Sequence, residues 1–422
     1  MRKILFVMGA ARAFVACEKD YQSVIEKTDL ETVVHNNKVS LKQALLYAEN
    51  SINGINPTTR SAERKVKSTE LYVAKPATRS AEDTEVSFYL INYEDNKGFA
   101  MVSTDSRATP VYAYSDSGNL TTESFENNPG LQIFMNGAIP YYEDEIANYI
   151  TYGIGDDRWP IDIPDTLDDP RPISVDGTLC YINTDTTTMV VDSLLTTAWH
   201  QDMPYNAYTS DYWNGNYPTG CGPTAIAQIM AYYRHPLSHN SSDTFGLVIY
   251  DWDLMLSNIR SNPGESDTDA TLAISKLMYQ IGEEAEARPR DGKTWTNPND
   301  LIEALNEFGY TSSNVVDFSS SIIKSQIDAN KPVYVTGVNP DTGVGHDWVI
   351  DGYEFENRIS KYYYAEPPFN LYKTTTHTTK YFHCNWGNPG FPYDTLENGL
   401  FLATGFTYTE DNQMIYNITP NI

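Results

Sequence analysis

One cysteine stands at the start of a predicted helix, and it is the residue best placed for chemistry. Cys221 lies in YPTGCGPTAIAQIM (217–230), where a turn runs into apolar residues at helical spacing. Pro223 suits a first helical turn, because its missing N–H costs nothing there. The helix dipole favours a thiolate at this end and lowers the pKa of a cysteine from its free value of ~8.5. Gly220 and Gly222 leave the sulfur open, so we expect a nucleophile; the alternative is a buried small residue.

A nucleophilic thiol needs a base, and His346 is the best candidate. It begins a predicted strand (345–353) directly after a Gly-rich turn, and another predicted strand (331–337) precedes that turn. A histidine there is positioned by a sheet without being enclosed by it. His383, near the end of a further strand, is the fallback base. Because a lone histidine is more often structural than catalytic, the pair needs a third member.

Asn385 is the candidate for that third member. It ends a predicted strand in YFHCNWG (381–387), and its carbonyl oxygen can accept the second imidazole N–H and hold the ring towards the thiol. Trp386 would cover this hydrogen bond and exclude water. An Asn-Trp-Gly turn is common, so the motif alone also fits a plain strand end.

Together these motifs closely resemble the streptopain family of papain-like cysteine peptidases, in the same order and at similar separations. The resemblance implies a nucleophile at Cys221, a base at His346, an orienting residue at Asn385 and its shield at Trp386. It also implies that Gln201, in WHQDMPYN (199–206), forms the oxyanion hole with the backbone N–H of Cys221.

The resemblance extends to the N-terminal region, with two departures near the site. Residues 88–93, 98–103 and 110–115 are similar to the family's inhibitory propeptide. Gly222-Pro223 replaces the Val-Ala that usually follows the cysteine, and Asp347 stands where a small residue often follows the histidine. The added negative charge would raise the pKa of the base.

The predicted fold class is α+β. We expect a papain-like catalytic domain of two lobes, one helical and one an antiparallel sheet or barrel, preceded by a small α+β prodomain. A helix after Ser40, strands at 86–93, 99–103 and 110–114, and an amphipathic helix over 131–150 build the prodomain. The expected segments are a leader (1–17), a linker with a short helix (18–85), an inhibitory prodomain (86–152, continuing from about 35), an acidic connector (153–192) and the catalytic domain (193–422).

Two segments are predicted to be exposed. The linker carries a duplication, PTTRSAE (57–63) and PATRSAE (76–82), whose arginines would also suit a trypsin-like activator. The connector is rich in Asp and Pro, cannot build a core, and is where we expect the maturation cleavage.

The first residues are typical of an export signal. Arg2 and Lys3 precede an apolar stretch (4–11), and FVAC (14–17) resembles the end of a bacterial lipoprotein leader, with Cys17 as the lipidated residue. Ordinary secretion stays open, because Arg12 interrupts the apolar stretch. Beyond the leader no apolar stretch approaches the ~20 residues that span a bilayer.

The charge and the residue composition of the chain disfavour several classes of partner and cofactor. The net charge is -27, from 29 Lys and Arg against 56 Asp and Glu, and no basic cluster occurs, which disfavours nucleic acid and anionic membranes as partners. No calcium loop or paired-His metal motif is visible, and the predicted chemistry needs no cofactor. A Cys180–Cys384 disulfide is possible in an oxidising compartment.

These observations predict a cysteine endopeptidase, made as a zymogen, that is secreted or anchored at the bacterial surface through Cys17. Its partners would be protein or peptide substrates and its own propeptide, acting as an intramolecular inhibitor. Two alternatives stay open: a Cys/His amidase or transglutaminase-like enzyme, which shares the triad, and a non-enzymatic surface lipoprotein on a degenerate protease fold.

Overall fold

The structure is a computed structural model. It describes the following residues of the 422-residue chain: 37–55, 64–74, 85–152, 173–175, 178–212, 217–241, 245–364, 366–368, 370–390, 396–408 and 411–421. The leader, both copies of the duplicated motif and most of the proline-rich connector lie outside these residues. The predictions made for them stay predictions.

The N-terminal part is a four-stranded antiparallel sheet with helices packed against it. Its elements are α1 (Leu41–Ile55), β1 (Val66–Val73), β2 (Ser87–Tyr93), a 3-10 turn (Glu94–Asn96), β3 (Phe99–Ser103), β4 (Val111–Ser115), α2 (Thr122–Asn127) and α3 (Pro129–Tyr152). The predicted helix after Ser40 and the three alternating strands are confirmed. Strand β1 was not predicted: it lies in the segment expected to be a linker, and it pairs with β2 as an exposed edge strand.

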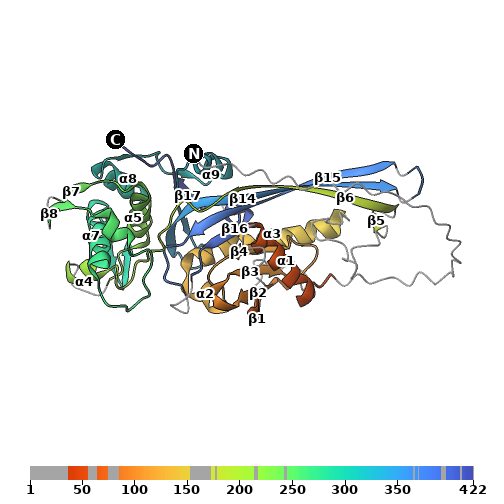
Figure 1. The fold of residues 1–422 in the computed structure, drawn as a ribbon, viewed down its shortest axis with the longest axis horizontal. Coiled ribbons are helices and arrows are strands. Elements are labelled where there is room, and N and C mark those ends of the chain that lie inside the picture. Colours follow the sequence, from red (N-terminus) through yellow and green to blue (C-terminus); the bar gives the residue numbers. More distant parts are fainter. Residues whose placement is uncertain are drawn as a thin grey trace.

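The helical lobe carries the predicted nucleophile segment (Figure 1, left). Helix α5 packs against α7 and α8, which bury its apolar face. Two short hairpins lie at the surface of this lobe. Its elements are α4 (Ala207–Tyr212), α5 (Cys221–Tyr233), β7 (Ser238–Ser241), β8 (Gly246–Ile249), α6 (Trp252–Leu256), α7 (Asp269–Glu284), β9 (Arg288–Arg290), β10 (Lys293–Trp295) and α8 (Pro298–Glu307).

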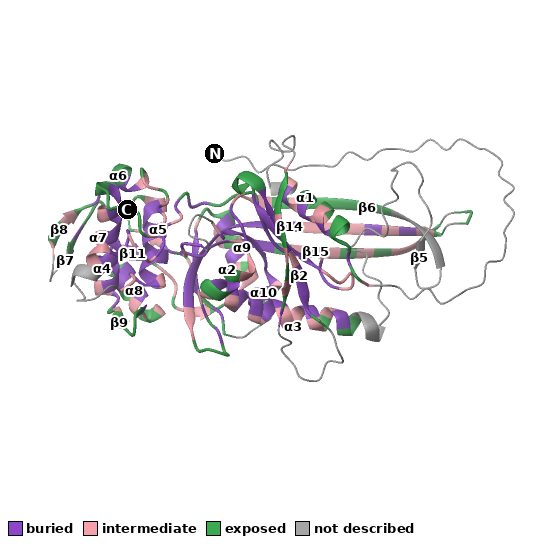
Figure 2. Ribbon diagram, turned by 90° about the horizontal axis from the view of Figure 1, so that it is seen from below, coloured by how far each residue is buried: buried purple, intermediate pink, exposed green. Residues whose placement is uncertain are grey.

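The second lobe is an antiparallel sheet, as expected from the α+β prediction. Buried residues of both lobes are drawn in purple in Figure 2. The elements of the second lobe are β5 (Ile173–Val175), β6 (Thr178–Val191), β11 (Tyr310–Thr311), β12 (Val316–Asp317), α9 (Ser320–Asp328), β13 (Val333–Val338), β14 (Gly345–Tyr364), β15 (Leu371–Asn385), β16 (Gly399–Leu402), α10 (Thr404–Thr407), β17 (Gln413–Ile415) and β18 (Thr419–Pro420).

The sheets of the two parts are continuous. The strand order runs β1-β2-β3-β4-β16-β15-β14-β13-β17-β12, and β4 joins β16 through the pairs Leu400 with Tyr114 and Phe401 with Ala113. The N-terminal part is therefore attached to the second lobe through backbone pairing as well as side-chain contacts.

Strands β6, β14 and β15 form a long three-stranded ribbon that projects from the body (Figure 1, right). Within residues 153–192, predicted to be an exposed connector, residues 178–191 form strand β6, which pairs with β14 from Val191 to Cys180. Many of its residues are β-branched, which favours a strand.

The ribbon also excludes the Cys180–Cys384 disulfide. Cys180 lies opposite Tyr364, whereas Cys384 lies opposite Ile350, and Cys384 is free and buried. Their partners on β14 are 14 residues apart, so at ~3.3 Å per strand residue the two cysteines are separated by roughly 45 Å along the ribbon. A disulfide can bridge only ~7 Å between Cα atoms.

Among the described residues no helix is both long and apolar enough to cross a lipid bilayer.

Candidate active site

Cys221 is the first residue of helix α5, as predicted. Gly220 precedes the helix at φ 98°, a conformation that disfavours any residue with a Cβ. The Thr224 hydroxyl donates to the Gly220 carbonyl at 2.8 Å, and the Thr294 hydroxyl donates to the Pro218 carbonyl at 2.6 Å. These bonds fix the turn that presents the sulfur at the helix N-terminus.

The sulfur of Cys221 meets a carboxylate and no imidazole. The thiol donates to Oδ2 of Asp347 at 3.5 Å. Burial and the Asp347 charge raise the pKa of the thiol well above its ordinary value. The expectation that the helix dipole lowers this pKa is therefore wrong for the structure described, because desolvation and a neighbouring negative charge outweigh the dipole.

His346 lies on the opposite face of β14 from the Cys221 sulfur. Neighbouring strand residues point to opposite faces, so the contact of Asp347 with the thiol turns His346 away. Nε2 of His346 is 2.8 Å from the Trp386 carbonyl oxygen, and the imidazole stacks along Trp348. The ring is buried, and burial lowers its pKa to about 4, so at neutral pH it is uncharged in this position.

Helix α3 of the N-terminal part covers this imidazole. A Cβ added to Gly130, in the first turn of α3, would lie 2.9 Å from Cδ2 of His346 and 2.3 Å from Cε3 of Trp386. Asn128 caps the helix by accepting from the Gly130 N–H at 2.9 Å and donates to Glu397 at 2.8 Å. The contact is too close to leave room for water or substrate beside the imidazole.

Asn385 is held by Gln228, a residue of α5 to which sequence reasoning gave no role. Nε2 of Gln228 donates to Oδ1 of Asn385 at 3.2 Å, while Nδ2 of Asn385 donates to the Thr197 carbonyl at 2.7 Å. Gln228 also accepts from the Trp199 N–H at 3.0 Å. Within the described structure no hydrogen bond joins Asn385 to His346. A buried glutamine on an otherwise apolar helix was the signal available in the sequence.

Gln201 and Trp386 make backbone contacts with the Cys221 turn and with His346, respectively. The Gln201 carbonyl accepts from the Thr219 N–H at 2.8 Å, which ties its loop to the turn before Cys221. Trp386 is fully buried against Trp348, Phe401 and Phe406. Its carbonyl oxygen is the atom that bonds to His346.

The fallback base His383 has another partner. Its Nδ1 is 2.6 Å from Oδ1 of Asp351, which is completely buried and also accepts from the Leu195 N–H. Burial alone lowers the pKa of His383, but the Asp351 carboxylate outweighs it and the net pKa is raised. This pair ties β14 to β15 and does not involve Cys221.

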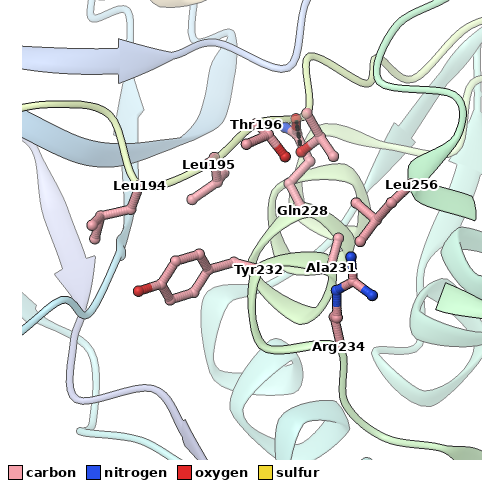
Figure 3. Close-up of a pocket in the computed structure, with 9 residues that line it drawn as sticks. Leu194, Leu195, Thr196, Gln228, Ala231, Tyr232, Arg234 and Leu256 are labelled. Atoms are coloured by element: carbon pink, nitrogen blue, oxygen red, sulfur yellow. Dashed lines mark hydrogen bonds between the residues drawn. The ribbon is translucent and has the colours of Figure 1, made fainter. Parts of the chain in front are cut away.

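A pocket of about 200 Å³ lies beside the C-terminal half of α5 (Figure 3). Gln228, Ala231 and Tyr232 line it from the helix, and Leu194 and Leu195 line it from the segment after β6. Because Cys221, Gln201 and His346 do not line it, this pocket is separate from these candidate residues.

Comparisons with known proteins agree with this division of the chain. Residues 199–394 match the model of the Peptidase C10 family, and residues 36–139 match the model of the Spi protease inhibitor. Streptopain of Streptococcus pyogenes is 26% identical over 389 residues, covering 78% of this chain and 82% of that protein. The thiol protease/hemagglutinin PrtT of Porphyromonas gingivalis is 25% identical over 375 residues, covering 81% of this chain and 38% of that protein.

Among solved structures, a fragment of prointerpain A from Prevotella intermedia is 20% identical, with a TM-score of 0.47, and covers 82% of this chain and 98% of its own. The resemblance to the streptopain family is confirmed by the family models and the relatives. The chain is a cysteine peptidase whose residues 199–394 form a Peptidase C10 domain and whose residues 36–139 form an inhibitor-like propeptide domain.

Proposed function

We propose that this chain is the zymogen of a secreted cysteine endopeptidase that acts through Cys221, His346 and Asn385. The observation that carries the proposal is the position of Cys221 at the N-terminus of α5, behind Gly220, with Gln201 tied to the same turn. In the mature enzyme the thiolate attacks the scissile carbonyl, and the Cys221 N–H and Gln201 stabilise the oxyanion. His346 protonates the leaving amine, and water then releases the acyl group from sulfur.

Latency follows from the position of His346. In the precursor its imidazole bonds to the Trp386 carbonyl and is covered by Gly130 of α3, so it cannot take the thiol proton. Removal of α3 uncovers the ring, and the first residues of β14 must then turn so that the imidazole reaches the sulfur. Asn385, already held by Gln228, offers Oδ1 to the second ring N–H.

We place the maturation cleavage before β6, in the part of the acidic connector that lies outside the described residues. Strand β6 is paired with β14 from Val191 to Cys180, so a protease would have to strip it from the ribbon to cut within it. The mature enzyme would keep β6 as an edge of the ribbon.

Secretion and lipid attachment at Cys17 rest on the leader sequence alone. Palmitate labelling of the natural host, with Cys17→Ser as control, distinguishes lipid anchoring from free secretion: label in the wild type and none in the variant supports the anchor.

The test of the function uses purified full-length protein with casein as substrate and a thiol-directed inhibitor as a control. We expect the precursor to shorten itself and then cleave casein, and Cys221→Ala to do neither. His346→Ala should behave like Cys221→Ala, whereas Cys384→Ala should cleave normally. Casein cleavage by Cys221→Ala would contradict the mechanism. A chain without residues 1–150 that stays folded yet inert would contradict the inhibitory role of the propeptide.

A further inference from the structure

Gly222 and Asp347 lie against each other beside the Cys221 sulfur. A Cβ added to Gly222 would lie 3.0 Å from Oδ2 of Asp347 and 2.5 Å from Oγ1 of Thr296. The same Oδ2 accepts the Cys221 thiol at 3.5 Å. A glycine at position 222 therefore leaves the space in which the Asp347 carboxylate reaches the nucleophile.

Asp347 is enclosed and has no cation to balance it. Its exposed fraction is 7%, and it lies opposite Thr336 of β13, whose side chain hydrogen-bonds its carboxylate. The titratable groups that face the Cys221 sulfur are Asp347 from β14 and Tyr334 from β13. Among the residues that the structure describes, no Lys, Arg or His forms an ion pair with Asp347.

An unbalanced buried carboxylate costs free energy, so its position beside the nucleophile calls for a role. A negative charge next to a thiol disfavours the thiolate, which is the reactive form. Because residues 346 and 347 alternate across β14, the carboxylate occupies the strand face that the imidazole must take for catalysis.

We propose that Asp347 is a positioning residue that holds Cys221 as a neutral, hydrogen-bonded thiol in the precursor, on the strand face that His346 takes over on activation. This inference rests on the proposed function of Cys221 and His346. It adds a second cause of inactivity in the precursor to the covering of His346 by α3. The precursor is inactive because His346 is displaced from the sulfur and because the Cys221 thiol is kept protonated.

The test measures alkylation of Cys221 in full-length protein that carries His346→Ala, so that no precursor is lost to self-cleavage. Iodoacetamide is the probe, and intact mass with peptide mapping gives the rate at Cys221 from pH 6.5 to 10. Asp347→Asn is nearly isosteric and removes only the charge. Asp347→Ala, which places a small residue there, is the second variant should the amide disturb the fold. Asp341→Asn, an exposed aspartate in the loop before β14, is the matched control.

We expect Asp347→Asn to raise the alkylation rate about tenfold at pH 7.5, which corresponds to one unit of thiol pKa. Because burial and the Asp347 charge raise the thiol pKa of the parent well above its ordinary value, the parent should still react more slowly than the variant at pH 10. Asp341→Asn should change nothing. Equal rates with and without Asp347 would overturn the proposal, and so would an equal gain in Asp341→Asn, because that indicates a general change in reactivity and not the charge beside the thiol. Since the readout is alkylation and not proteolysis, such a result leaves the peptidase proposal to the casein assay.

Discussion

Glu354 offers a pH-dependent test of how the propeptide is held. It lies on β14, is 5% exposed, and accepts a hydrogen bond from the hydroxyl of Tyr114 on β4 of the propeptide domain. Its Oε2 has no hydrogen-bond partner. Burial raises the pKa of this carboxyl from 4.5 to about 7. Tyr114 and Glu356 are the titratable groups that act on it.

The direction of the pH effect on stability follows from whether the folded or the unfolded chain holds the Glu354 proton more tightly. Below pH 4.5 the carboxyl is neutral in the folded and the unfolded chain, so its burial carries no charge penalty. Between pH 4.5 and about 7 the unfolded chain loses the proton first, and the folded precursor is destabilised as the pH rises. A shift of this size corresponds to at most about 3 kcal/mol above pH 7, at ~1.4 kcal/mol per unit.

Glu354→Gln removes the ionisation while its carbonyl oxygen keeps the Tyr114 hydrogen bond. We expect the variant to melt several degrees higher than the parent at pH 8 and at nearly the same temperature at pH 4.5, both in a Cys221→Ala background. Glu366→Gln, an exposed glutamate between β14 and β15, serves as the control and should change neither value. If the difference between variant and parent is the same at both pH values, the assignment of a buried, neutral carboxyl is wrong.

Three further predictions concern the site and its supports. Gly130→Ala places a Cβ against Trp386 and His346, so it should loosen the packing of α3 and speed self-cleavage several-fold on gels. Glu126→Ala, at an exposed position, should not change the rate. An unchanged rate of self-cleavage in Gly130→Ala would show that α3 does not cover His346. Gln228→Leu removes one partner of Asn385 and the side-chain acceptor of the Trp199 N–H, so urea unfolding should show a loss of about 2 kcal/mol and casein cleavage should fall with it; retained stability would show that Gln228 does not support Asn385. His383→Gln removes a histidine whose raised pKa stabilises the folded chain below about pH 6.5, an effect that is lost as the pH rises. The melting temperatures at pH 5.5 and pH 8 should therefore differ less in the variant than in the parent. An unchanged difference would contradict the pairing of His383 with Asp351.

Local patterns predicted many of the elements well. The run from Gly220 to Met230 gave the helix start at Cys221, because a glycine turn, an early proline and apolar residues at helical spacing are all encoded within a few residues. Alternation predicted β2, β3 and β4 to within a residue or two. The streptopain resemblance located the candidate site residues along the chain.

Features that depend on distant partners were not predicted. Strands β1 and β6 lie in polar segments, and each forms because a neighbouring strand supplies its hydrogen bonds. The face on which His346 lies depends on α3, Trp386 and Asp347, which its own sequence neighbours do not reveal. The raised pKa of the Cys221 thiol also depends on a distant residue. The helix dipole can be inferred from local sequence, but Asp347 is 126 positions away. The roles of His346 and Asn385 in catalysis stay predictions.

The junction between β4 and β16 has a consequence for the mature enzyme. While the propeptide is attached, Leu400 and Phe401 exchange backbone hydrogen bonds with a neighbouring strand. If maturation removes the propeptide as proposed, β16 would become an edge strand with unpaired backbone amides and carbonyls beside buried apolar side chains. Such borders invite association between copies. On the proposed maturation, the paired propeptide domain would therefore also cover this edge and prevent it from pairing with a second copy.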